Sequence, residues 1–369
     1  MSRLGVESSI IDRIYETAFL PELWVDVLDR IALLARCDGG FLFSVDAQQR
    51  VRAVTSERYG PLLDAYVAGG WGARNIRAPR LANMNYPGFV VDYDVVTPHE
   101  AATDPFYDYL RKYGGGWGTG TIIPMPTGDL VVFDIERSGD KGPLDRSVLT
   151  SLDQLRPHLA RSALMSVRLG LEQARAMSEA LGKIGLPGAV LRDDGTVLST
   201  NSLMEALDKQ FIPLARGRLG MSHRPAHDLF HAAVAEFTWN GSGVHSCSIP
   251  IPAIDNSPAC VVHLIPVRRR ARDIFSGAAI LLAVTSLAKP DTPPAHVLNG
   301  LFDLTPAEAN VARQLVGRHS VGEIAATNCV SRETIRRQLK SVLEKTGTKR
   351  QAELVGLLTG VQLPRGTSP

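Results

Sequence analysis

Apolar side chains recur at helical spacing in the stretch Ser331-Arg-Glu-Thr-Ile-Arg-Arg-Gln-Leu-Lys-Ser-Val-Leu343. Ser331 opens this stretch with a hydroxyl group that suits a helix N-cap. Residues three and four apart share one face of a helix, and that face would consist of Ile335, Leu339, Val342 and Leu343. The opposite face would consist of Arg332, Arg336, Arg337 and Lys340. The stretch therefore predicts a helix with one buried apolar face and one exposed basic face.

Three further helical patterns surround this helix between Asn299 and Gly360. All four patterns open at a hydroxyl residue, and these residues are Thr305, Ser320, Ser331 and Thr348. A Glu or Gln three residues after Thr305, Ser320 and Thr348 completes the capping-box pattern. Gly317 and Gly347 stand where helix ends need a C-cap. Short helices, tight turns and a basic third helix predict an all-α four-helix unit of the helix-turn-helix type.

A helix of this kind lies in the major groove of DNA. An Arg side chain can pair with both acceptors on a guanine edge, and Arg and Lys both hold phosphates. The candidate DNA-binding residues are Arg332, Thr334, Arg336, Arg337, Lys340, Lys345, Lys349 and Arg350. A bare run of charges is usually a solvated helix face, but the order of helices and turns favours double-stranded DNA as the partner here.

Six short motifs extend this pattern. They are Leu304-Thr-Pro-Ala-Glu308, Val311-Ala-Arg-Gln-Leu-Val-Gly317, Glu323-Ile-Ala325, Val330-Ser-Arg-Glu-Thr-Ile335, Lys345-Thr-Gly347 and Lys349-Arg-Gln-Ala352. Together they resemble the LuxR-type helix-turn-helix of bacterial transcription regulators. The resemblance implies that Arg336, Arg337 and Lys340 face the bases and that the helix after Gly347 contributes to dimerisation. The sequence departs from the family at Gln338, where many members have His, and at Asn328, where an aliphatic residue is usual.

The chain has 369 residues, of which 44% are hydrophobic and 21% charged. This length suggests two or three domains, and the composition excludes a disordered or collagen-like chain. The longest apolar run, around 280–284, is too short to span a bilayer, and no signal segment opens the chain. We expect a cytoplasmic protein that does not bind membranes. The cysteines have no metal-ligand spacing, which indicates a reduced compartment; they are Cys37, Cys247, Cys260 and Cys329.

The net charge of +2 is unevenly distributed along the chain. Residues 1–165 contain 17 basic and 21 acidic side chains, whereas residues 290–369 contain 10 and 7. Seven basic and two acidic residues fall between Ser331 and Arg350. A polyanion would therefore dock near the C-terminal end.

The first 165 residues predict a mixed unit. Strand-like runs at 40–45 and 51–56 and at 118–125 and 130–136 form two hairpins. Helices are expected at 10–35, at 60–67 and from Pro143 onward, the last long and kinked at Pro157. This unit resembles GAF-like ligand-sensing folds, and 166–185 would continue its last helix as a connector that also packs against a symmetry mate.

A second mixed unit is expected at 186–288. A hairpin at 188–200 turns at Asp193-Asp-Gly195, Asn201 caps a short helix to Leu207, and a helix covers 226–237. Strands at 243–252, 259–268 and 278–287 complete a five-stranded antiparallel sheet with helices on one side. This unit resembles a PAS-like domain. A proline-rich linker at 289–298 leads to the helix-turn-helix domain at 299–369, so the fold class is α+β.

Aromatic residues of the first unit offer weak candidates for effector contact. Such a cluster is more often core than pocket, but sensor pockets are mostly apolar with a few polar groups. The candidates are Trp71, Arg77, Phe106, Tyr109 and Trp117. The stretch 66–77 does not reproduce the pocket pattern of acyl-homoserine-lactone receptors, which puts a lactone effector in doubt.

Other motifs favour simple structural interpretations. The glycine-rich run 114–120 lacks a GK[ST] ending and leads into a strand, so it is not a phosphate loop. His223, His227 and His231 repeat on one helix face, with His245 and His263 near by, but a polar face is more common than a metal or haem site. The run Arg268-Arg-Arg270 with Arg272 is either a solvated sheet edge or an extra DNA contact.

These patterns predict a homodimeric transcription regulator that reads an inverted repeat and responds to a small molecule or a partner. No cofactor or metal is expected, and RNA polymerase is a candidate partner. Enzyme chemistry lacks a motif, so we expect no enzyme. The alternatives are an enzyme with its site in residues 1–165 and a protein-interaction adaptor. The sequence identifies neither the effector nor the operator.

Overall fold

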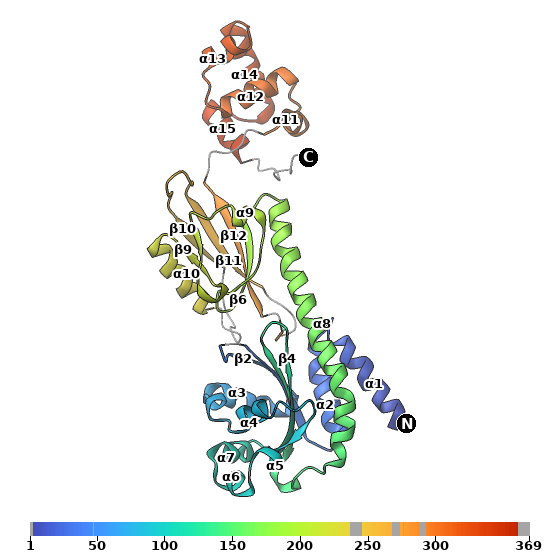
Figure 1. Cartoon of the computed structure of the whole chain (residues 1–369). Coiled ribbons are helices and arrows are strands. Elements are labelled where there is room, and N and C mark those ends of the chain that lie inside the picture. The colour runs from blue at the N-terminus through green and yellow to red at the C-terminus, as the bar shows by residue number, and fades with distance from the viewer. Residues whose placement is uncertain are drawn as a thin grey trace.

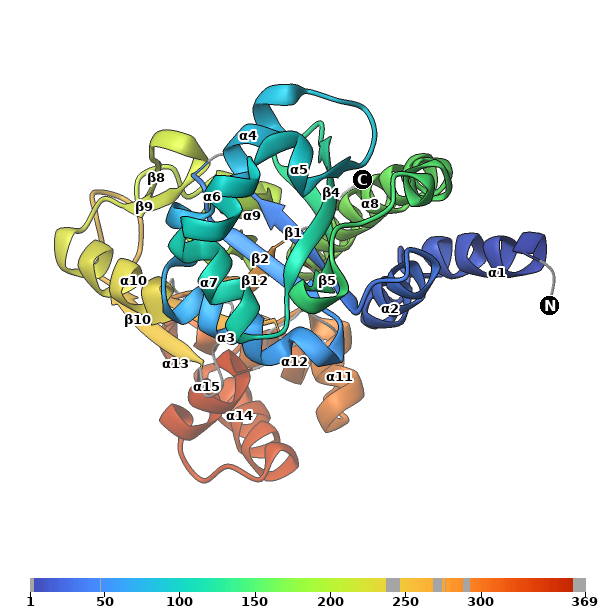
Figure 2. The ribbon, with the colours of Figure 1, turned by 90° about the horizontal axis from the view of Figure 1, so that it is seen from below.

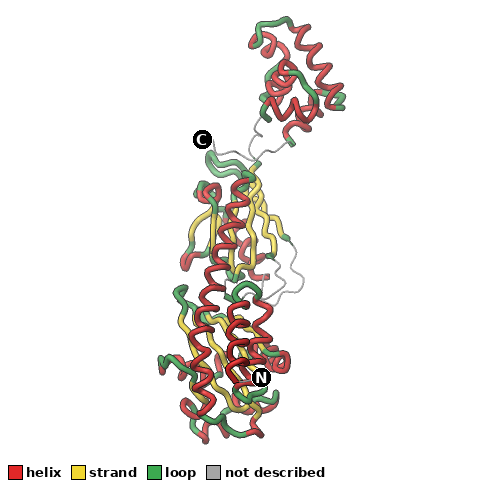
Figure 3. The backbone as a smooth tube through the Cα atoms, turned by 90° about the vertical axis from the view of Figure 1, so that its right-hand side faces the viewer, coloured by secondary structure: helices red, strands yellow, loops and turns green. Residues whose placement is uncertain are grey.

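The computed structural model describes residues 3–46, 48–236, 246–267, 274–275, 277–287 and 293–360. Two mixed units and one helical unit follow one another along its length (Figure 1). Figure 3 shows that the C-terminal unit consists of helices and loops, whereas the other two contain strands.

A five-stranded antiparallel sheet with strand order β2-β1-β5-β4-β3 forms the centre of the first unit. Its strands are β1 (Gly39–Val45), β2 (Val51–Thr55), β3 (Val90–Val91), β4 (Gly116–Pro124) and β5 (Leu130–Ser138). The β1–β2 and β4–β5 hairpins confirm both predicted pairings. The two-residue β3, which pairs with Gly120 and Thr119, is too short to give a sequence signal.

Helices cover both faces of this sheet, and Figure 2 shows the two sets on opposite sides. One set is α1 (Arg3–Glu16), α2 (Trp24–Leu34) and the long α8 (Ser147–Lys183). The other is α3 (Gly60–Ala68), α4 (Arg77–Met84), α5 (Asp92–Val95), α6 (Pro98–Thr103) and α7 (Pro105–Lys112) with the 3-10 turns η2 (Glu57–Tyr59) and η3 (Trp71–Arg74). The single helix expected at 10–35 is wrong. The chain breaks at Pro21, which opens η1 (Pro21–Leu23), because proline cannot continue a helix interior.

The long helix α8 links the two mixed units (Figure 1). Its first half buries Leu152, Leu155 and Leu159 in the core of the first unit. Its second half contacts β6, β7 and β12 of the second unit. Asn201 donates a hydrogen bond to the carbonyl of Ser178 at 2.8 Å, which fixes the end of α8 against the second sheet. The prediction of one long helix containing Pro157 is confirmed.

The second sheet has the strand order β10-β11-β12-β6-β7. Its strands are β6 (Gly188–Arg192), β7 (Val197–Thr200), β10 (Cys247–Ile251), β11 (Cys260–Pro266) and β12 (Ala278–Ser286). Gly195 turns the first hairpin at φ +80°, and Asn201 accepts from the Met204 amide as the predicted cap. One face packs on α9 (Ser202–Glu205), on α10 (Arg224–Glu236) and on a small hairpin of β8 (Phe211–Pro213) and β9 (Leu219–Met221). The sequence did not predict this small hairpin.

The two sheets share one strand order. Numbered within each sheet, both run 2-1-5-4-3. In both units, helices in the connection between the second and third strands of the sheet cover the face opposite α8. The five-stranded antiparallel sheet predicted for the second unit is confirmed, and the first unit has the same architecture. The second unit differs from the prediction because α8 covers the other face of its sheet.

The C-terminal unit contains five helices among residues 293–360. They are α11 (Ala295–Phe302), α12 (Pro306–Val316), α13 (Val321–Thr327), α14 (Arg332–Thr346) and α15 (Gln351–Thr359). Four were predicted; α11 begins inside the range expected as linker because Leu298 is fully buried in this core. The capping boxes at Thr305 and Ser320 are confirmed. The box at Thr348 is wrong, since α15 starts two residues later with Arg350 as N-cap.

The predicted C-cap at Gly347 adopts φ +69°. At Gly317 the left-handed residue is instead the next one, Arg318, with φ +64°. Within the described residues, none of the helices has both the length and the hydrophobicity that a membrane span needs.

Candidate functional site

The exposed face of α14 carries the basic residues that the sequence singled out. Ser331 accepts a hydrogen bond from the Thr334 amide at 3.0 Å and caps the helix. Ile335 and Val342 are fully buried against α12 and α13, whereas Leu339 and Leu343 are half-buried. This anchoring rotates Arg332, Arg336, Arg337 and Lys340 to the exposed side. The predicted orientation of the helix is confirmed.

Two ion pairs lie along this face, and both are open to solvent. Arg336 lies 3.4 Å from Glu333, and Lys340 lies 3.9 Å from Glu344. All four side chains are more than two-thirds exposed. Exposed pairs of this kind contribute little to stability, so these charges are free to exchange their partners for phosphates or bases. Lys349 and Arg350 are also exposed, at the start of α15.

Two of the predicted DNA-binding residues make contacts inside the unit. Lys345 donates to the Asp303 carbonyl and to Glu308 Oε2, both at 2.8 Å, and so holds the end of α14 against the start of α12. Its hydrogen bond, with that from Ser341, lowers the pKa of Glu308 to about 2. The Thr334 hydroxyl lies 2.9 Å from Ser331 Oγ in the cap. Both side chains are held within the domain, unlike the exposed residues that are proposed to contact DNA.

Asn328 explains one departure from the LuxR-type pattern. Its Oδ1 accepts hydrogen bonds from Gln314 Nε2 at 2.9 Å and from Asn310 Nδ2 at 3.3 Å. Both donors lie on α12, so a polar residue holds the turn between α13 and α14 in the place of an apolar contact. Cys329 follows at φ +53°, which completes the sharp change of direction.

A cavity of about 440 Å³ lies in the first unit, between the sheet and the segment η3–α4. This volume falls in the range of small-molecule sites. Its apolar wall includes Phe43, Val45, Val51, Tyr66, Leu81, Val90, Val95 and Val132. Its polar wall consists of Gln49, Asn75, Arg77, Asp92 and Asp134. The cavity therefore suits a mostly apolar molecule with one polar end.

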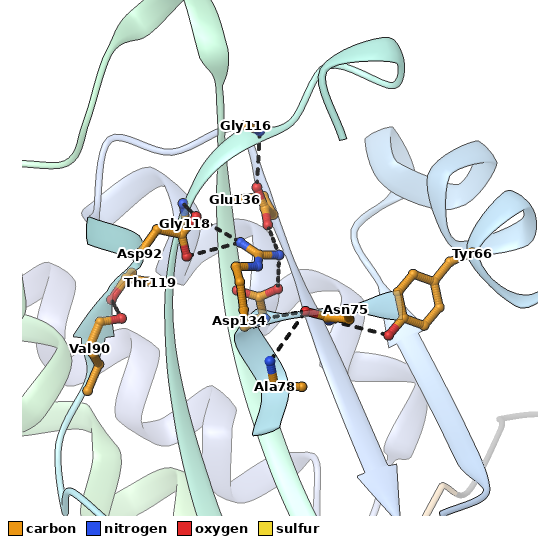
Figure 4. Close-up of polar contacts among 11 residues, drawn as sticks. Tyr66, Asn75, Ala78, Val90, Asp92, Gly116, Gly118, Thr119, Asp134 and Glu136 are labelled. Atoms are coloured by element: carbon orange, nitrogen blue, oxygen red, sulfur yellow. Dashed lines mark hydrogen bonds and ion pairs between the residues drawn. The ribbon is translucent and has the colours of Figure 1, made fainter. Parts of the chain in front are cut away.

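Arg77 is the centre of the polar wall. Figure 4 labels the three acidic residues around its guanidinium, which are Asp92, Asp134 and Glu136. Its Nη1 lies 3.0 Å from Asp92 Oδ2, and its Nη2 lies 2.6 Å from Glu136 Oε1 and 3.2 Å from Asp134 Oδ2. The backbone amide of Gly118 donates to Asp92 at 2.9 Å. One guanidinium thus faces three carboxylates, two of which are buried with it. The ring of Phe106 lies 5.3 Å from the guanidinium carbon.

This arrangement raises the pKa of two of the acids and of the cation. Burial raises the pKa of Glu136 and of Asp134 above their ordinary values, and Arg77 only partly opposes that effect. Burial by itself would lower the pKa of Arg77, but the three carboxylates hold it well above its ordinary value. The cluster therefore keeps its cation and carries more carboxylate than one cation can balance.

Local sequence places these groups. Along β5 the side chains alternate, so Val131, Phe133 and Ile135 enter the core with α2 and α8 while Val132, Asp134 and Glu136 face the other way. Gly118 on the neighbouring β4 lies directly under the guanidinium. A Cβ there would come within 2.5 Å of Arg77 Nη1. The glycine-rich run is therefore part of a strand, and this glycine leaves room for Arg77.

Of the five predicted effector residues, the structure places only Arg77 in the cavity wall. Phe106 and Tyr109 are buried in an aromatic cluster with Tyr59, and Trp71 stacks on Tyr109 with ring centres 4.6 Å apart. The indole of Trp117 donates to the Gly139 carbonyl at 3.3 Å. Sequence reasoning missed Asp92 and Asp134. The alternation Val132-x-Asp134-x-Glu136 in a predicted strand was the signal that could have found the second.

Histidines noted in the sequence contact one another or neighbouring hydroxyl groups. The rings of His227 and His231 on α10 are tilted against each other with centres 4.4 Å apart, and His263 lies within hydrogen-bond distance of Ser248 and Thr285. Within the described ranges, no group of three or more metal-ligating side chains is suited to a metal. All four cysteines are free thiols. His245 and the basic run 268–272 lie outside the described residues.

Solved structures similar to this chain come from bacterial regulators. They include the N-acylhomoserine lactone dependent LuxR family transcription factor CepR2 from Burkholderia cenocepacia, with 18% identity over 43% of this chain and 96% of that chain and a TM-score of 0.35. Escherichia coli SdiA matches with 13% identity over 98% and 100%, TM-score 0.35. The VqsR LBD domain from Pseudomonas aeruginosa matches with 13% identity over 44% and 96%, TM-score 0.37.

The chain resembles LuxR-family regulators. No protein-family model and no curated protein matches it.

Proposed function

We propose that this protein is a LuxR-type, sequence-specific DNA-binding transcription regulator controlled by a small molecule in the cavity of the first unit. The exposed basic face of α14 carries the proposal. Arg336, Arg337 and Lys340 project from a capped helix whose opposite side is fixed in the core. Arg332, Lys349 and Arg350 flank them and suit the phosphate backbone.

DNA selection from random-sequence duplexes tests this function. The selected operator should bind the wild-type protein tightly and in a salt-dependent manner, because phosphate contacts release counterions. Arg337→Ala and Lys340→Ala should each lose about 1–3 kcal/mol of operator binding. Arg224→Ala on α10 is the matched control, since Arg224 is an exposed arginine that pairs with Asp228. An adaptor that binds an acidic protein would select no sequence.

We further propose that the protein binds DNA as a homodimer and that its operator is an inverted repeat. Two-fold symmetry would place two copies of α14 on half-sites one helical turn or a multiple apart. Sedimentation velocity of the protein alone and with a single operator duplex gives the stoichiometry. A stoichiometry of two chains per duplex supports the symmetry, and one chain per duplex contradicts it.

The first unit is proposed as GAF-like and the second as PAS-like, with the shared strand order as support. The effector is proposed to place an apolar body against Phe43, Val51 and Leu81 and a hydrogen-bond donor against Asp134. Native mass spectrometry of protein purified from its own host would show such a molecule as added mass. Asp134→Asn should release it, whereas Asp228→Asn should not.

A further inference from the structure

The first and second units meet at an ion-pair network at one end of the cavity. Arg52 Nη2 lies 3.0 Å from Asp193, and Arg50 Nη2 lies 2.8 Å from Asp194. A weaker contact joins Arg192 to Asp129 at 3.6 Å. Arg50 and Arg52 belong to the β1–β2 hairpin of the first unit, and Asp193 and Asp194 lie in the β6–β7 turn of the second. The six residues of these contacts are called the junction below.

The junction is partly shielded from solvent. The side chain of Arg52 is 3% exposed, and those of Asp193 and Asp194 are below 20%. Pairs shielded in this way are screened less by salt than surface pairs are. Their geometry therefore matters to the energy of the contact between the units.

The same hairpin is also a wall of the cavity. Val45 and Val51 line the cavity and pair directly across the hairpin. Successive strand side chains point to opposite faces, so Val51 faces the cavity while Arg52 faces the second unit. Gln49, at the tip, lines the cavity next to Arg50 in the chain. A molecule that pushes on one face of the hairpin moves the groups on the other.

The tip of the hairpin is held as one piece. Asp46, which is 2% exposed, accepts from the amides of Gln48 and Arg50 at 2.8 and 3.0 Å and from Arg50 Nε at 2.8 Å. Displacement of the tip therefore carries the Arg50 guanidinium with it. An apolar contact keeps the units together independently, because Phe275 of the β11–β12 connection is buried beside Trp24 of the first unit.

Strand pairing in the second unit connects the β6–β7 turn to the strand that precedes the C-terminal helical unit. The β6–β7 turn ends β6, and β6 pairs with β12 through Leu191 opposite Ile280 and Ala189 opposite Leu282. The strand β12 is the last element before the C-terminal helical unit.

We propose that the junction transmits occupancy of the cavity to the second unit through the β1–β2 hairpin. The proposal rests on the proposed function only in taking the cavity as the effector site. A ligand that shifts the hairpin changes the Arg50 and Arg52 contacts and thereby biases the β6–β12 pair that precedes the DNA-binding unit.

Hydrogen–deuterium exchange of the full-length protein tests this coupling, with a phenyl group built into the cavity as the occupant. Val132→Phe fills the cavity from β5, beside Phe43 of the hairpin. It should change exchange rates at 188–200 by about fivefold, a modest allosteric coupling. With Asp193→Asn and Asp194→Asn also present, the change should disappear at 188–200 while remaining at 43–52.

Asp228→Asn is the matched background, because it removes an exposed ion pair on α10 and should leave the transmitted change intact. An equal change at 188–200 with and without the two junction aspartates would overturn the proposal and assign transmission to α8. No change at 188–200 in any background, with a change at 43–52, would also overturn it. Leu81→Phe fills the cavity from α4 if Val132→Phe does not fold.

These outcomes are independent of DNA. A protein that shows the coupling but selects no operator would contradict the proposed function and leave the junction proposal standing.

Discussion

The two mixed units have the same strand order but bury different chemistry. On the face of the first sheet that α3–α7 cover, the fifth strand presents Val132, Asp134 and Glu136 beside a cavity. On the corresponding face of the second sheet, the fifth strand presents Ile280, Leu282 and Val284 to an apolar core with Phe230. Strand order positions the face, and the alternate residues of one strand decide whether that face packs or binds.

This comparison assigns different tasks to the two units. A unit that buries one arginine with an excess of carboxylates gives up stability, and a cavity beside those charges gives a reason to retain them. A unit filled with apolar side chains gains stability and transmits displacement, because packed cores deform little. The first unit is accordingly the proposed sensor and the second the proposed relay.

The largest effect should follow removal of the central cation. Arg77→Met leaves three carboxylates without their partner, and we expect a loss of about 3–5 kcal/mol in the unfolding free energy at pH 7. The loss should be smaller at pH 5, where Asp134 and Glu136, whose pKa values burial raises, are neutralised by protonation. Urea unfolding followed by tryptophan fluorescence measures it, since Trp24, Trp71 and Trp117 all lie in the first unit.

Arg146→Met is the control for that variant, because Arg146 is an exposed arginine paired with Asp94. It should change stability by less than about 1 kcal/mol. Equal losses in the two variants would mean that the Arg77 cluster is no more costly to break than a surface pair.

A smaller effect of opposite sign is expected from Glu136→Gln. The pKa of Glu136 is raised in the folded protein, mainly by burial. The protonated side chain therefore favours folding below its ordinary pKa, and this stabilisation is lost as the pH rises through the raised value. Glutamine cannot ionise, so the variant does not lose stability in this way. Its stability relative to wild type should rise between pH 5 and pH 8 by on the order of 1 kcal/mol, measured by urea unfolding at several pH values. A fall in relative stability over that range would show that the carboxylate is stabilising when charged.

The smallest dependence on pH is expected in the second unit. Phe230→Leu in its apolar core should cost roughly 1–2 kcal/mol, without dependence on pH between 5 and 8. Thermal unfolding at both pH values measures this. A pH-dependent loss would indicate a buried charge in the second unit and would weaken the contrast between the sheets.

The sequence predicted most of the architecture because its signals are local. Hairpins at 39–55 and 116–138 follow from alternation and turn residues, and the helical unit follows from N-caps such as Thr305 and Ser320. Structures that depend on distant contacts were missed. The two-residue β3 exists only because β4 pairs with it, and α11 exists because Leu298 reaches a core built by later helices.

The two candidate sites also differ in whether local sequence can predict them. The basic face of α14 could be predicted, because one helix carries both its apolar and its charged side. The cavity could not, since Arg77, Asp92 and Asp134 come from three elements that only the fold brings together. Lys345 is predicted to contact DNA from its charge and its place after the basic face, whereas its partner Glu308 lies 37 residues earlier in the chain.

The central claim, that α14 reads a DNA sequence, is tested most directly by fluorescence anisotropy with the selected operator and a scrambled duplex at one salt concentration. The account predicts that Arg337→Ala weakens operator binding by about 1–3 kcal/mol and scrambled-duplex binding by much less. An equal loss on both duplexes would show that Arg337 contacts only phosphate. Unchanged affinity for both would contradict the assignment of α14 to the major groove.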